Sequence, residues 1–89
     1  MRITKKTLIK TVDEITDFLM QSNQDLLQAE LEENYEQCDF IQTAIYLFIS
    51  NKATLLAEAG KTTYKVIFDR LKDQSDYIFK TLKERSEQA

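Results

Sequence analysis

The chain is 89 residues long and contains no proline and a single glycine, Gly60. Tight β-turns rely heavily on these two residue types, so this composition argues against a fold of many short strands. Leu, Glu, Gln, Lys and Ala, which all favour helices, are abundant. We therefore expect an all-α fold, organised as one domain over residues 1–89.

Apolar side chains recur every three to four residues in four stretches, which predicts helices at about 5–21, 24–37, 40–59 and 63–85. Thr4 or Thr7 is suited to cap the first of them. The polar segment QSNQD would separate the first two helices, with Ser22 or Asn23 as the next N-cap.

The first two helices can instead be read as one. A single helix over residues 4–37 would reach about 50 Å, whereas the third helix would reach only about 30 Å. The longer helix would overhang unless a partner covered it. A monomer therefore favours the break and a dimer permits the continuous helix, and the sequence leaves both open.

The third predicted helix is apolar nearly all round in the segment AIYLFI, residues 44–49. That pattern is typical of a helix in the centre of a bundle or in a dimer interface. We expect Asp39 to cap this helix and Gly60 to end it in the left-handed conformation. The predicted fold is a small bundle of three or four helices with the apolar third helix in the middle.

The last helix has heptad-like spacing, interrupted by one polar residue. Thr62 or Thr63 would cap it. Its seam, with spacings of 4, 3, 4, 3 and 4, consists of Tyr64, Phe68, Leu71, Ser75, Ile78 and Leu82. Tyr77 and Phe79 flank Ile78, so the three cannot point into the same groove. We expect at least one of these aromatic residues at the edge of the core, where aromatics often anchor interfaces.

The net charge of −3 conceals a segregation of charge along the chain. Residues 1–10 carry four cations and no acid, residues 11–60 carry ten acids and one cation, and residues 61–89 carry seven cations and five acids. The densest acidic group is Asp25, Glu30, Glu32, Glu33 and Glu36, followed by Asp39. Asp25, Glu32 and Glu36 should lie close to one helical face. That face is either simply solvated or a docking surface for a basic partner.

The composition argues against catalysis. Histidine is absent, and one glycine cannot form a phosphate-binding loop. We therefore predict no enzyme activity, no metal site and no cofactor. The single cysteine, Cys38, allows no internal disulfide and is expected as a small residue at the core or its boundary.

Composition and charge also bear on partners and location. Cations in the last helix alternate with acids, which argues against direct nucleic-acid binding. The longest apolar run has six residues, whereas a membrane span needs about 20. We expect a protein of the cytoplasm, or of the host cytoplasm if a phage encodes it.

Residues 27–44 resemble part of a known motif. Leu27, Leu31, Glu32, Glu33, Asp39, Phe40 and Ala44 fit the pattern of the UVR-type helical hairpin of the UvrB and UvrC excision-repair proteins. The resemblance implies a turn near residues 38–40 that carries the Asp-Phe pair. It also implies helical-hairpin pairing between proteins.

Together these features predict a non-enzymatic protein-interaction module that self-associates through helix packing. The candidate contact residues are Asp25, Glu32, Glu33, Glu36, Asp39, Leu71, Tyr77 and Phe79. The alternative is a small acidic inhibitor, of a type that phages encode, which occupies the basic groove of a nucleic-acid-handling protein. Binding by such an inhibitor should weaken steeply with salt, whereas apolar self-association should barely respond.

Overall fold

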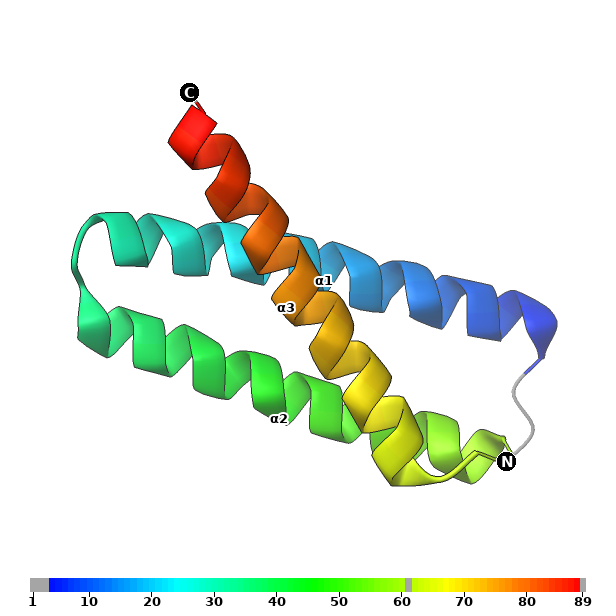
Figure 1. The fold of residues 1–89 in the computed structure, drawn as a ribbon. Coiled ribbons are helices and arrows are strands. Elements are labelled where there is room, and N and C mark those ends of the chain that lie inside the picture. The colour runs from blue at the N-terminus through cyan, green and yellow to red at the C-terminus, as the bar shows by residue number, and fades with distance from the viewer. Residues whose placement is uncertain (1–3, 61, 89) are drawn as a thin grey trace.

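The structure is a computed structural model, which describes residues 4–60 and 62–88. It contains three α-helices: α1 (Lys5–Leu31), α2 (Tyr35–Ala59) and α3 (Tyr64–Gln88). Helices α1 and α2 form an antiparallel hairpin, and α3 crosses that hairpin diagonally (Figure 1). The predicted all-α bundle is confirmed with three helices.

Helix α1 continues through residues 21–25, where we predicted a break. Its start agrees with the prediction, because the Thr4 hydroxyl oxygen accepts a 3.2 Å hydrogen bond from the Thr7 backbone N–H. The predicted break is wrong because Asn23 does not cap a second helix. Its side chain is 1% exposed and lies in the core.

The continuous α1 does not overhang, because the next helix is also longer than predicted. Helix α2 begins at Tyr35 rather than near residue 40 and has 25 residues, against 27 in α1. At 1.5 Å per residue the two helices reach about 38 and about 40 Å. The length argument for a break therefore does not apply to this hairpin.

The turn between α1 and α2 lies at residues 32–34, so the turn that we predicted at residues 38–40 is wrong. Glu33 adopts a positive φ of 56°, and the Asn34 N–H donates a 2.9 Å hydrogen bond to the Ala29 carbonyl oxygen. The Asn34 side-chain oxygen then accepts from the Gln37 N–H at 3.2 Å and caps α2. Asp39 lies inside α2 and is not its cap.

Helix α2 ends at Ala59, as the position of Gly60 predicted, but Gly60 is not left-handed. Its φ of −116° and ψ of −173° are extended, and its N–H donates a 3.0 Å hydrogen bond to the Leu56 carbonyl oxygen. A Cβ at this position would lie 3.3 Å from that same oxygen. A larger side chain at residue 60 would therefore crowd the Leu56 carbonyl oxygen, and the backbone conformation itself does not require glycine.

One apolar core joins the three helices. Its buried residues are Ile15, Leu19 and Ala29 of α1, Ile41, Ile45, Ile49 and Ala53 of α2, and Leu71 and Ile78 of α3. Each helix packs against both of the others. The predicted central position of the apolar helix is not found, because Leu47, within the segment 44–49, is 62% exposed.

The heptad-like seam of α3 packs inside this bundle. Leu71, Ser75 and Ile78 are buried, and Phe68 and Leu82 are partly buried against the core. The polar interruption at Ser75 is therefore a core position. The seam that suggested self-association is used to hold α3 onto its own hairpin.

Candidate interaction surfaces

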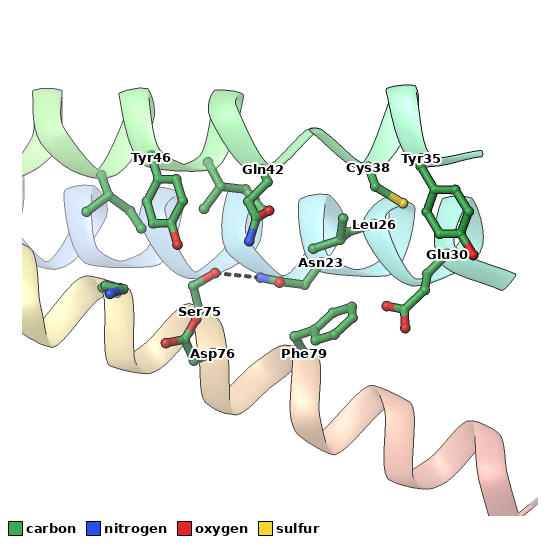
Figure 2. A pocket seen from close by; sticks show the side chains of 13 residues that line it. Asn23, Leu26, Glu30, Tyr35, Cys38, Gln42, Tyr46, Ser75, Asp76 and Phe79 are labelled. Atoms are coloured by element: carbon green, nitrogen blue, oxygen red, sulfur yellow. Dashed lines mark hydrogen bonds between the residues drawn. The ribbon is translucent and has the colours of Figure 1, made fainter. Parts of the chain in front are cut away.

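A groove opens where α3 diverges from the N-terminal half of α2, and α1 forms its floor (Figure 2). We call it the three-helix groove. Leu26 lies on the floor, Tyr35, Cys38 and Tyr46 come from α2, and Phe79 comes from α3. The groove encloses about 290 Å³. This is near the lower limit for pockets that hold small molecules, about 300 Å³.

The polar atoms at the bottom of the groove are paired with each other. The Asn23 side-chain nitrogen donates a 3.0 Å hydrogen bond to Ser75 Oγ and a 2.7 Å hydrogen bond to the Leu19 carbonyl oxygen (Figure 2 shows the first). No buried side-chain polar atom among the described residues lacks a partner. The groove thus offers apolar and aromatic contacts, but no buried polar group that awaits a ligand.

Both signs of charge surround the groove. Glu30 and Lys83 form an ion pair with 3.2 Å between Oε1 and Nζ, and both side chains are well exposed to solvent. Lys72 and Asp76 lie farther along the lining. A rim with mixed charge does not select a ligand of either sign.

The five predicted acidic residues are all exposed, but they do not share one helical face. Asp25 lies on α1, Glu32 and Glu33 lie in the turn, and Glu36 and Asp39 lie in the first turns of α2. The prediction of one face is wrong because the hairpin turn falls between Glu32 and Glu36. The turn instead brings four of the acids to one end of the hairpin.

The three predicted apolar contact residues have different environments. Leu71 is 9% exposed and belongs to the core, so a partner cannot reach it in this fold. Phe79 is partly buried in the wall of the three-helix groove. Tyr77 is 71% exposed and borders a smaller hollow beside Met20. Tyr77 and Phe79 thus point to different sides of α3, as their positions around Ile78 predicted.

The residues that point away from the core on α2 form a surface that the sequence analysis missed. We call it the outer stripe. Its members recur every three to four residues, and all are exposed: Glu36, Phe40, Thr43, Leu47, Asn51, Thr54 and Glu58. The buried residues Ile41, Ile45, Ile49 and Ala53 lie on the opposite side of the same helix. Phe40 is 69% exposed.

The other two helices present charged or amide residues where α2 presents Phe40 and Leu47. The corresponding face of α1 carries Lys6, Lys10, Asp13, Asp17, Gln21, Gln24 and Gln28, all exposed, and ends in Leu31, which is 61% exposed. That of α3 begins with Val66, which is 42% exposed, and continues with Asp69, Asp73, Asp76, Lys80 and Glu84, also exposed. The outer stripe of α2 is therefore distinct from both, because an apolar pair occupies its N-terminal half.

The described residues also bear on metal binding, on the environment of the thiol and on membrane spans. Within residues 4–60 and 62–88, no group of three or more His, Cys, Asp or Glu side chains could hold a metal ion. Cys38 is partly buried against the core, at the boundary where we expected it. None of the helices in the described part of the chain is long and apolar enough to span a membrane.

Comparison with known proteins finds no match among family models, curated proteins or solved structures. What the chain does must therefore be inferred from its surfaces.

Proposed function

We propose that this chain is a non-enzymatic protein-interaction module that binds a helix of another protein. The observation that carries the proposal is the outer stripe of α2, where Phe40 and Leu47 are 69% and 62% exposed on the side opposite the core. Two large apolar side chains at a spacing of seven residues match the way in which one helix seats another. Association would bury surface that the bundle itself leaves in water.

The distribution of apolar side chains supports the same proposal. Among the described residues, thirteen large apolar or tyrosine side chains are exposed, whereas seven are buried in the core. Scattered exposed apolar residues are normal. What requires an explanation is the pair Phe40 and Leu47 on the outer side of α2, because charges at those positions would favour solubility and the outer faces of α1 and α3 carry mainly charged or amide residues.

A second copy of the chain is a less favourable partner for this surface than a different protein. The heptad-like seam, which predicted self-association, is already packed inside the bundle. Acids occupy both ends of the outer stripe and no cation lies on it, so a second copy offers these acids no opposite charge. Light scattering across a range of concentrations tests self-association directly, and we expect a monomer.

The proposed function is tested by capturing partners with the full chain as bait, from an extract of the cells that make it. The variant baits are Leu47→Lys and the control Asp17→Lys, which place a lysine on the outer faces of α2 and α1. We expect a partner that Leu47→Lys loses and Asp17→Lys keeps. If no captured protein responds to Leu47→Lys, the outer stripe is not an interaction surface and the proposal fails.

A second candidate is the acidic inhibitor, and the acids gathered at the hairpin turn favour it. In this case Glu32, Glu33 and Glu36 would occupy the basic groove of a nucleic-acid-handling protein. Reversing these three charges should abolish binding, and rising salt should weaken it steeply. The same binding should withstand replacement of Phe40 and Leu47, which separates this candidate from the first.

A further inference from the structure

The outer stripe of α2 carries negative charge and no positive charge. Glu36 and Glu58 are its first and last residues. Asp39 is not a member of the stripe, but it lies about one helical turn after Glu36, near the hairpin turn. The single cation of α2, Lys52, lies on another side, with its Nζ 5.5 Å from the centre of the Phe48 ring. Along α2 itself, a partner on the outer stripe would therefore meet acids and no cation beside the apolar pair.

We propose that the outer stripe seats a cationic amphipathic helix of a partner protein. This inference rests on the proposed function and adds the chemistry of the partner. The apolar side chains of that helix would pack against Phe40 and Leu47, and its Lys or Arg residues would face the acids. Charge complementarity at the rim would steer the encounter, while the apolar pair would hold the complex.

The spacing on α2 specifies the partner helix further. Phe40 and Leu47 are two helical turns apart, about 10.5 Å along the axis, so the partner needs apolar residues over at least two turns. The acids are unevenly distributed. Glu33, Glu36 and Asp39 lie near the hairpin turn, whereas Glu58 is the single acid at the far end of the stripe. The cations of the partner should be concentrated at the end that faces the hairpin turn, which fixes the orientation of the partner.

The same charges argue against a second copy as the occupant. If two outer stripes paired antiparallel about Leu47, Glu36 of one copy would face Glu58 of the other, because both lie eleven residues from Leu47. If they paired in parallel, each acid would face its own equivalent. Both of these registers oppose like charges, and an antiparallel register that pairs Phe40 with Leu47 places Glu36 opposite Asn51. No register pairs an acid of one stripe with a cation of the other, because the outer stripe contains no cation.

The test uses synthetic helical peptides of about 18 residues, a length that can form several helical turns. The first peptide carries a Leu stripe with Lys on both flanks, and the second has the same Leu stripe with Glu in place of Lys. Each peptide carries a fluorophore, and its anisotropy is followed during titration with the full chain. We expect the Lys peptide to bind, the Glu peptide not to bind, and the affinity for the Lys peptide to fall as salt rises.

Matched variants locate the binding site. Phe40→Ser combined with Leu47→Ser should weaken binding of the Lys peptide about tenfold or more, whereas Tyr77→Ser on α3 should not. Glu36→Gln should reduce the affinity and its salt dependence, whereas Asp17→Asn on α1 should change neither. Circular dichroism confirms that each variant keeps its helices.

Three results would overturn the inference: equal binding of the Glu and Lys peptides, no loss with the paired serine variant, or equal loss with Asp17→Asn and Glu36→Gln. These outcomes leave the proposed function standing if the partner captured by the bait still depends on Leu47. In that case the outer stripe would bind a protein, but not a cationic helix. If no partner captured by the bait depends on Leu47, both the proposed function and this inference fail.

Discussion

The Asn23 side-chain nitrogen and the Ser75 hydroxyl oxygen are 3.0 Å apart in the core, and their hydrogen bond joins α1 to α3. Asn23 is 1% exposed and Ser75 is 5% exposed, so this hydrogen bond at the bottom of the three-helix groove has little access to bulk water. The same Asn23 nitrogen also donates to the Leu19 carbonyl oxygen at 2.7 Å. Asn23 and Ser75 are polar residues at core positions of α1 and α3. Each satisfies the hydrogen-bonding need of the other, and their bond fixes the position of α3 on the hairpin.

Removing the serine hydroxyl should destabilise the fold. Ser75→Ala leaves one amide hydrogen of Asn23 buried without an acceptor, and we expect a loss of about 1–3 kcal/mol of unfolding free energy. Urea denaturation followed by circular dichroism measures this loss. The control is Ser86→Ala at an exposed position, which should stay within about 0.5 kcal/mol. A loss for Ser75→Ala no greater than for Ser86→Ala would show that the buried hydrogen bond contributes nothing.

Replacing both partners should recover the stability that the single change loses. In Asn23→Leu with Ser75→Ala, no buried donor remains unpaired and the side-chain volume is largely kept. We expect this double variant to be within about 1 kcal/mol of the wild type, or more stable. A double-mutant cycle that also includes Asn23→Leu isolates the coupling between the two residues. Additive losses in that cycle would contradict a direct interaction.

A glycine at the hairpin turn should stabilise the protein. Glu33 has a φ of 56°, a conformation that costs a residue with a Cβ about 1–2 kcal/mol. Glycine adopts it freely but loses more entropy on folding, so Glu33→Gly should gain about 0.5–1 kcal/mol. Glu32 is the matched control, because its φ of −83° is right-handed and Glu32→Gly should be destabilising. Thermal unfolding of both variants and of Glu33→Gln separates the backbone effect from the charge effect.

Composition and apolar spacing were sufficient to predict an all-α fold. Residue type gave Thr4 as one of two candidate caps, and Gly60 indicated the end of a helix at Ala59. Apolar spacing could not decide between a break in the first helix and a continuous α1. The segment QSNQD has the composition of a helix break, and Asn23 shows its role only beside Ser75, 52 residues away. The polar position in the seam of α3 was a signal for a buried polar contact. No local pattern identifies which residue of α1 would meet it.

The hairpin turn was misplaced because two good N-cap residues compete for the start of α2. Asn34 and Asp39 are equally suitable by residue type. The structure uses Asn34, which places Asp39 and Phe40 inside the helix. The earlier start of α2 also explains why the acidic contact residues were predicted on one helical face. The acids predicted on one face lie on both sides of a turn. Leu47 of the outer stripe lay in the segment 44–49, which was interpreted as the centre of a bundle or part of a dimer interface.

The two faces of the segment 44–49 should respond differently to truncation. Ile49 is 0% exposed, and Ile49→Ala should cost about 2–5 kcal/mol of unfolding free energy through the cavity that it leaves. Leu47 is 62% exposed, so Leu47→Ala should change stability by less than about 0.5 kcal/mol. Urea denaturation of the two variants makes the comparison. A large cost at Leu47 would instead indicate that this residue is covered in solution, for example by a second copy.

The stacked rings of Phe18 and Phe48 should couple α1 and α2 beyond simple burial. Their centroids are 3.8 Å apart with an interplanar angle of 20°, and both side chains are partly buried against the core. Phe18→Leu and Phe48→Leu keep most of the apolar volume, so each should cost less than about 1.5 kcal/mol. A double-mutant cycle by urea denaturation should give a coupling of about 0.5–1.5 kcal/mol.

Lys52→Met tests the cation above the Phe48 ring, and its effect should disappear in the Phe48→Leu background, since leucine has no ring to attract the charge. An undiminished Lys52→Met effect in that background would mean that Lys52 acts through other contacts.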